Sequence, residues 1–183
     1  MKTIQVLKTG NEGKGTDNIM RDIKIDKVIL NVGAGNDEAK LNKSLKLLEL
    51  LSGQKPIKTL SKKRIPTWHI RPGLAIGCMV TLRKKKAEQV LKRILEAKEN
   101  KLSTRQFIPG SLSFGIKEYI QIPGMTYSRE IGIIGFDVSV SLKRSGFRIQ
   151  EKKIRRGKIP AKHRISKEET INFFKENFNL EVK

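Results

Sequence analysis

The chain has 183 residues, of which 37% are hydrophobic and 31% are charged. This length predicts one domain with its own core, and the composition is too apolar for an intrinsically disordered chain. Lys and Arg number 39 against 18 Asp and Glu, which gives a formal net charge of +21. Because such an excess opposes compaction by self-repulsion, it indicates a polyanionic partner: nucleic acid first, an acidic membrane surface second.

Several classes of site and of protein are excluded by composition. A single cysteine, Cys78, rules out an internal disulfide and a cysteine metal cluster, and two histidines, His69 and His163, cannot build a histidine-rich site. No apolar run approaches the roughly 18 residues of a membrane span, and the first residues contain no apolar core of a signal peptide. We therefore expect an intracellular protein without metal or cofactor.

The first half of the chain alternates between strand and helix patterns. Residues 1–22 predict an N-terminal arm with a flexible loop, because residues 9–18 hold three glycines and no apolar residue. Residues 23–32 predict a strand. A helix follows, with Asn36 or Asp37 as its cap and Gly53 as its stop.

Further strands and one long helix follow in the middle of the chain. Residues 57–61 and 76–83 predict strands on either side of a basic loop, 62–73, that contains two prolines. Residues 84–99 predict a helix. Residues 111–117 and 136–143 alternate between apolar and small polar side chains, which predicts two half-buried strands.

The end of the chain is strongly basic. Residues 143–164 contain ten Lys or Arg and a single acid, Glu151, so we expect an extended arm there. Ser166 and Glu169 form a capping box that opens a last helix. The predicted organisation is an arm (1–22), an α+β nucleic-acid-binding domain (23–143), and a basic extension with a C-terminal helix (144–183).

These elements predict an α+β fold. Its sheet should be largely antiparallel, with helices packed on one apolar face. The other face should be small, polar and basic, because Asn31, Thr81 and Arg83 lie opposite the apolar residues of their strands.

Two glycine-rich segments do not match nucleotide-binding motifs. Residues 10–16 lack the spacing of a phosphate loop and are better explained as a surface loop. Gly33 and Gly35 lie between a strand and a helix, but Glu38 stands where a dinucleotide motif needs its third glycine. We interpret this segment as a tight turn.

Basic residues gather around the only tryptophan. Residues 62–64 and Arg71 flank Trp68 and His69, a pattern that suits phosphates beside a ring that stacks on a base or sugar. Packing of Trp68 in the core is an equally good interpretation. Residues 83–86 place four cations where a helix begins, which opposes the helix dipole unless a phosphate lies between them.

Six short blocks, in consistent order over about residues 18–165, resemble the universal 5S-rRNA-binding protein five family of the large ribosomal subunit. The blocks are 28–33 (VILNVG), 52–56 (SGQKP), 70–73 (IRPG), 76–83 (IGCMVTLR), 113–116 (SFGI) and 135–138 (GFDV). Residues 159–164 (IPAKHR) and the final helix resemble the archaeal and eukaryotic branch.

The resemblance implies a structural constituent of the cytoplasmic ribosome and not an enzyme. Such a protein holds 5S rRNA in the central protuberance, contacts P-site tRNA and bridges to a protein of the small-subunit head. Large-subunit rRNA and neighbouring central-protuberance proteins are further implied partners. The rRNA-binding positions correspond here to Asn31, Gln54, Trp68 and Thr81, with Lys58 and Arg83 beside them, and the tRNA-binding loop to Lys62, Lys63, Arg64, His69 and Arg71.

Three other functions fit the sequence less well. A DNA-packaging protein would share the charge but has no need for amide and hydroxyl groups at fixed places on a sheet. An RNA-modifying or RNA-cleaving enzyme needs a general base and a pocket, whereas histidines are scarce here and acids are scattered. A membrane-surface protein needs one strongly basic amphipathic helix, and the predicted core helices mix acids and bases on their outer faces.

Overall fold

The computed structural model describes residues 18–183, so the predicted arm and glycine-rich loop before Asn18 lie outside the described residues. Strands are β1 (Ile23–Gly33), β2 (Ile57–Leu60), β3 (Ala75–Leu82), β4 (Lys101–Leu102), β5 (Phe107–Ile108), β6 (Ser111–Ile116), β7 (Phe136–Arg144) and β8 (Glu181–Val182). Helices are α1 (Glu38–Ser52), α2 (Lys84–Glu96), α3 (Arg148–Glu151) and α4 (Lys167–Phe178). Short 3₁₀ helices are η1 (Ile19–Arg21), η2 (Pro66–Trp68), η3 (Thr104–Gln106), η4 (Tyr119–Gln121) and η5 (Ala161–His163).

Six strands form one sheet in the order β2-β3-β1-β7-β6-β5, and every neighbouring pair is antiparallel. The predicted α+β class and the largely antiparallel sheet are therefore confirmed. A separate pair, β4 with β8, runs parallel and was not predicted. It joins the C-terminal residues to the segment that follows α2.

One face of the sheet carries the core. Val28 and Leu30 of β1 are fully buried, and the register places Leu30 beside Val80 of β3 and Val138 of β7. Cys78 is buried in the same layer, where loss of solvation raises the pKa of its thiol to about 11. Cys78 is thus a small core side chain, as the alternation predicted.

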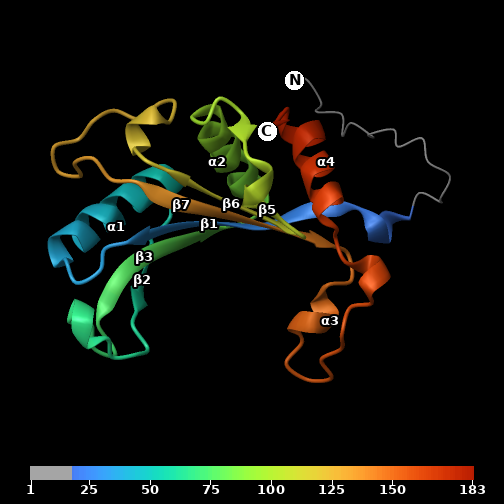
Figure 1. Cartoon of the computed structure of the whole chain (residues 1–183), viewed down its shortest axis with the longest axis horizontal. Helices are drawn as coiled ribbons and strands as arrows, with labels where there is room; N and C mark the ends of the chain where they lie inside the picture. Colours follow the sequence, from blue (N-terminus) through green and yellow to red (C-terminus); the bar gives the residue numbers. More distant parts are fainter. Residues whose placement is uncertain (1–17) are drawn as a thin grey trace.

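Helices α1, α2 and α4 lie over this apolar face (Figure 1). The side chain of Asp37 accepts a hydrogen bond from the backbone N–H of Lys40 at the start of α1, and Gly53 ends the helix at φ 60°. Of the two predicted caps, Asn36 and Asp37, the helix uses Asp37, and Gly53 is the predicted stop. Helix α2 buries one stripe of side chains, and α4 buries Phe174 in the same core.

Two segments extend from the opposite side of the sheet (Figure 1). One is the connection between β2 and β3, which includes η2. The other, residues 145–165, is the predicted basic arm, and two short helices, α3 and η5, interrupt it. Ile159 and Ile165 are buried, and they attach this basic segment to the body of the protein.

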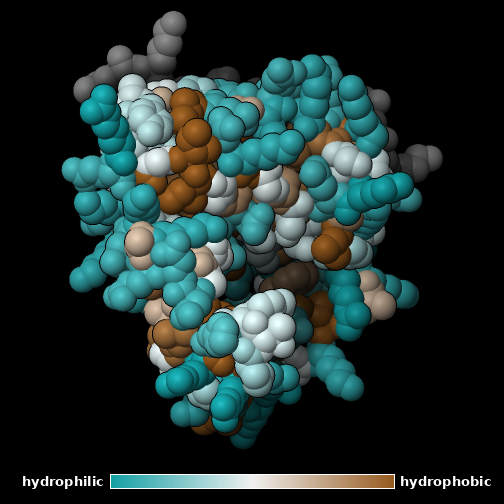
Figure 2. Space-filling view, turned by 60° about the vertical axis from the view of Figure 1, so that its left-hand side comes forward, coloured by the Kyte–Doolittle hydropathy of each residue, from teal (hydrophilic) through white to brown (hydrophobic). Residues whose placement is uncertain are grey.

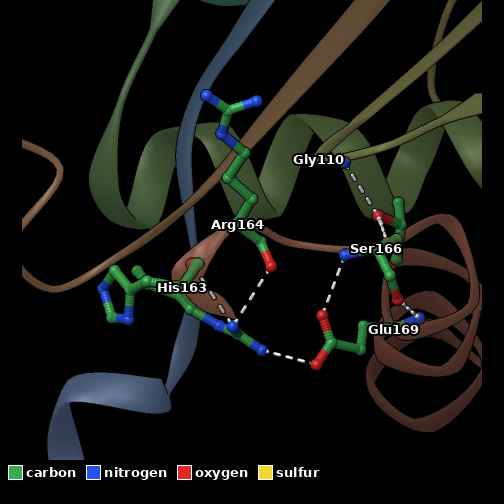
Figure 3. Close-up of polar contacts among 7 residues, drawn as sticks. Gly110, His163, Arg164, Ser166 and Glu169 are labelled. Atoms are coloured by element: carbon green, nitrogen blue, oxygen red, sulfur yellow. Dashed lines mark hydrogen bonds and ion pairs between the residues drawn. The ribbon is translucent and has the colours of Figure 1, made fainter. Parts of the chain in front are cut away.

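A buried arginine fastens the C-terminal part of the chain to the sheet. Arg144 ends β7 and donates hydrogen bonds to the backbone carbonyls of His163 and Arg164 and to Glu169 Oε1, the last at 2.6 Å. Glu169 also accepts from the backbone N–H of Ser166, which completes the predicted capping box (Figure 3). The network joins the strand, the basic segment and α4.

The Arg144 ion pair also sets the ionisation of Glu169. Burial raises the pKa of the carboxyl group, but the Ser166 hydrogen bonds and the Arg144 guanidinium outweigh burial, and the pKa falls below its ordinary 4.5. Because the folded-state pKa is depressed, this pair stabilises the fold above pH 4.5 and loses its effect as the pH falls through the lowered pKa.

Glu169→Ala should destabilise the protein, because the Arg144 side chain, only 6% exposed, would keep its charge without a carboxylate. We expect the free energy of unfolding at pH 7 to fall by about 2 kcal/mol, less than for a fully buried pair because Glu169 is partly exposed. Urea unfolding measures this loss. Glu168→Ala, at an exposed position of the same turn, should cost less than about 0.5 kcal/mol, and equal losses would contradict the assignment.

Candidate nucleic-acid interface

The sheet face opposite the helices is lined mainly by small polar side chains. The register places Asn31 of β1 beside Asp137 of β7, and Ser113 of β6 beside Ser139 of β7. The two serine hydroxyl oxygens lie 3.2 Å apart. Thr81 of β3 is exposed on the same face. These side chains offer hydrogen-bond donors and acceptors over a surface that no helix covers.

A buried carboxylate organises the basic end of this face. Asp26 is 8% exposed and lies where the β1–β7 register shifts between Ile25 and Lys27. Its Oδ1 lies 2.8 Å from an Arg83 guanidinium nitrogen and 2.5 Å from Lys143 Nζ. Asp26 therefore holds two cations at the edge of the polar face, where about half of each side chain remains exposed.

These two cations also determine the ionisation of Asp26. Burial raises the pKa of the carboxyl group, and the contacts with Lys143 and Arg83 more than reverse that effect. The net pKa is lower than its ordinary 3.8. Asp26 is consequently a structural anion at neutral pH.

The connection between β2 and β3 is a hydrogen-bonded hairpin. Ile65 and Ile70 exchange two backbone hydrogen bonds of 2.9 and 3.1 Å, and Ile70 is buried. Pro66 opens η2 between them, and His69 ends η2 in the left-handed region at φ 54°. The predicted tRNA-loop residues Lys62, Lys63, Arg64, His69 and Arg71 are all exposed on this hairpin.

Trp68 lies in η2 and is 65% exposed, so its interpretation as a core residue was wrong. Figure 2 brings the β2–β3 side of the molecule forward and shows a largely hydrophilic surface with small apolar patches. An exposed indole among cations is available to stack on a base or a sugar.

The structure does not bring all the predicted rRNA-binding residues together. Asn31, Thr81 and Arg83 lie on or at the edge of the polar face, and Trp68 lies on the hairpin. Lys58 pairs with Cys78 in the register, which places it on the opposite, helix-covered side of the edge strand β2. Gln54 follows α1, where Ser52 Oγ contacts its backbone.

Three residues at the centre of the polar face were missing from the predicted site. Ser113, Asp137 and Ser139 alternate with buried residues of β6 and β7, so the same period-two signal that identified Thr81 also pointed to them. Together with Asn31 and Gly115 they line a shallow hollow.

Within residues 18–183, no three His, Cys, Asp or Glu side chains come together as a metal would require. In the same range no helix is long and apolar enough to cross a membrane.

His163, the second histidine of the sequence, makes a contact within the fold: its Nε2 atom lies 2.9 Å from the carbonyl oxygen of Ser145.

Comparison with known proteins gives a consistent assignment. Residues 18–71 match the family described as Ribosomal protein L5, and residues 75–173 match the model of the C-terminus of the same ribosomal family. Proteins called large ribosomal subunit protein uL5 are similar to this chain over most of its length. The protein of Nanoarchaeum equitans is 46% identical over 89% of this chain and 97% of its own length. That of Methanobrevibacter smithii is 43% identical over 89% of this chain and 96% of its own length. That of Sulfolobus acidocaldarius is 42% identical over 91% of this chain and 94% of its own length.

The chain belongs to the ribosomal protein L5 family. The resemblance of the six sequence blocks is thereby confirmed. Members of the L5 family are structural proteins of the cytoplasmic ribosome and not enzymes. The chain is a large-subunit ribosomal protein that binds rRNA and takes part in translation.

Asp26→Asn should lower the stability of this L5 protein by about 2 kcal/mol at pH 7, because Arg83 and Lys143 would lose their shared carboxylate. The stabilisation is complete above pH 3.8 and is lost as the pH falls through the lowered pKa. The free energies of unfolding of variant and wild type should therefore become equal in strong acid. Urea unfolding at several pH values checks this. Asp22→Asn, at an exposed position, is the control, and equal stability of all three proteins at pH 7 would refute the role of Asp26.

Proposed function

We propose that this protein binds 5S rRNA through the polar face of its sheet and helps to attach that RNA in the central protuberance. We further propose that the β2–β3 hairpin contacts P-site tRNA, and that the protein bridges to a protein of the small-subunit head. Other partners are large-subunit rRNA and neighbouring central-protuberance proteins. One observation carries the proposal: the sheet face left bare by the helices displays Asn31 and Thr81, with Arg83 and Lys143 at its edge.

The chemistry of this face fits RNA. Amide and hydroxyl groups such as those of Asn31 and Thr81 can hydrogen-bond to ribose 2′-hydroxyls and base edges. Arg83 and Lys143 are held by Asp26 but remain about half exposed, so they can also neutralise phosphates. A DNA-packaging surface needs only the second of these properties.

The two segments beyond the polar face add positive charge on either side of it (Figure 1). Their basic side chains are all exposed: the hairpin carries Lys62, Lys63, Arg64 and Arg71, and the segment around α3 carries Lys152, Lys153, Arg155, Arg156 and Lys158. An RNA helix seated on the sheet would lie between these projections. The same geometry supports separate RNA partners for the tips of the two segments.

Asn31→Ala and Thr81→Ala should weaken 5S rRNA binding more than they affect folding. Each should lose about 1–3 kcal/mol of binding free energy if a buried RNA group is left unpaired, while the melting temperature stays nearly unchanged because both side chains are exposed. Filter binding and thermal melting measure the two effects. Asn42→Ala, on the outer side of α1, is the matched control and should bind normally.

The salt dependence of the same binding reaction tests the electrostatic part of the proposal. Each phosphate contact should contribute about −0.7 to −0.9 to the slope of log K against log salt concentration. Binding that is indifferent to salt, or equally tight binding to random duplex DNA, would reject the proposed interface.

Replacing Lys63, Arg64 and Arg71 together with alanine should leave folding and most 5S rRNA affinity intact, because these exposed side chains lie on the hairpin and not on the sheet. Ribosomes that contain the variant should release P-site tRNA faster, most clearly at raised salt, where the remaining charge contacts are screened.

A matched control removes the same charge elsewhere: Lys40, Lys43 and Lys175, exposed on α1 and α4, become alanine. This variant should release tRNA at the wild-type rate. Equal tRNA release from the hairpin variant, together with a large loss of 5S rRNA affinity, would assign the hairpin to rRNA instead.

A further inference from the structure

The polar face contains a shallow hollow of about 400 Å³ between β1, β7 and β6. Its side chains come from Asn31, Ser113, Asp137 and Ser139, and Gly115 leaves one side open. A Cβ atom added at Gly115 would lie 3.2 Å from Asp137 Oδ1. The absence of a side chain at Gly115 therefore keeps the carboxylate of Asp137 accessible from the hollow.

The charge at this place is unexpected for a surface that meets RNA. Asp137 is exposed and takes part in none of the five ion pairs found among residues 18–183. Asp26, the other acid of this face, is instead neutralised by Arg83 and Lys143. An exposed carboxylate without a paired cation repels phosphate, so the group that approaches Asp137 should be a cation or a neutral hydrogen-bond donor, and on RNA the donors are the bases and the ribose hydroxyls.

The four bases differ in what they can offer to a carboxylate. On its Watson–Crick edge, guanine presents two adjacent donors, the N1–H and the N2 amino group. Adenine and cytosine present one amino donor beside an acceptor nitrogen, and uracil presents one N–H between two carbonyls. A carboxylate accepts two parallel N–H bonds in a fork, and these charge-assisted bonds are stronger than neutral ones.

We propose that the hollow receives one unpaired guanine of the bound RNA and that Asp137 accepts hydrogen bonds from its N1–H and N2 amino groups. Asn31, opposite Asp137 in the register, can donate to the guanine O6 atom. Single-stranded and bulged bases are the usual targets of sequence-specific RNA recognition, because their Watson–Crick edges are free. The inference rests on the proposed binding of 5S rRNA to this face and adds a specificity determinant to it.

Asp137→Asn separates this proposal from simple electrostatics. If Asp137 only repels phosphates, removing its charge should tighten RNA binding. If Asp137 recognises guanine, the asparagine amide offers one acceptor and one donor to the two guanine donors, so one of the two hydrogen bonds is lost. The affinity for 5S rRNA should then fall about tenfold. Asp22→Asn removes the same charge at an exposed position away from the hollow and should not weaken binding.

Inosine interference identifies the base. 5S rRNA transcripts carry inosine phosphorothioate at a small fraction of guanosine positions, so each molecule lacks about one N2 amino group. RNA bound to wild-type protein and to the Asp137→Asn variant is recovered and cleaved with iodine, and plain guanosine phosphorothioate corrects for backbone effects. We expect one guanosine position at which inosine prevents binding to the wild-type protein. At the same position, inosine should have no effect on binding to the Asp137→Asn variant.

The outcomes are distinguishable. Identical interference patterns for the two proteins, or tighter binding by Asp137→Asn, would overturn the guanine site while leaving 5S rRNA binding in place. That result is expected if Asp137 instead forms an ion pair with an arginine of a neighbouring protein. Wild-type protein that fails to select 5S rRNA would instead overturn the proposed function. Gly115→Ala keeps the charge but narrows access to Asp137, and it should weaken binding and reduce the same interference.

Discussion

The structure depends on burying one face of an antiparallel sheet under helices while the other face stays uncovered. Successive side chains of a strand point to opposite faces, so the register that packs Leu30 against Val80 and Val138 also sets Asn31 beside Asp137. A slip by one residue would exchange the two faces. The hydrophobic core therefore also positions the polar side chains that we propose to face RNA.

The excess positive charge is handled in two different ways. Asp26 and Glu169 fix the cations nearest to the core, where an unpaired charge would be costly. Many of the other basic side chains are exposed on α2, the hairpin and the segment around α3, where water solvates them. A polyanion that binds only the folded protein would relieve their mutual repulsion and stabilise the fold by mass action. Such binding would link folding and RNA binding thermodynamically.

The sequence predicted the features that depend on local patterns. Alternation located the strands, and Asp37, Gly53 and the Ser166–Glu169 capping box marked helix ends correctly. Features that depend on distant partners were missed. Strands β4 and β8 pair although three strands and two α-helices separate them along the chain, and no local pattern specifies this pairing. Arg144 was counted among the basic residues of the expected extended arm, whereas it is buried and pairs with Glu169.

The proposed guanine site suggests a reason why a strongly basic protein would use a carboxylate, that of Asp137, to recognise RNA. A charge at hydrogen-bonding distance acts almost unscreened, whereas at physiological salt its effect on phosphates fades over about 8 Å. At the proposed guanine site, Asp137 would therefore discriminate strongly among bases while repelling the more distant backbone only weakly. The many exposed cations around the face outweigh that repulsion. The protein would thus lose little RNA affinity at this one position and gain selectivity among bases.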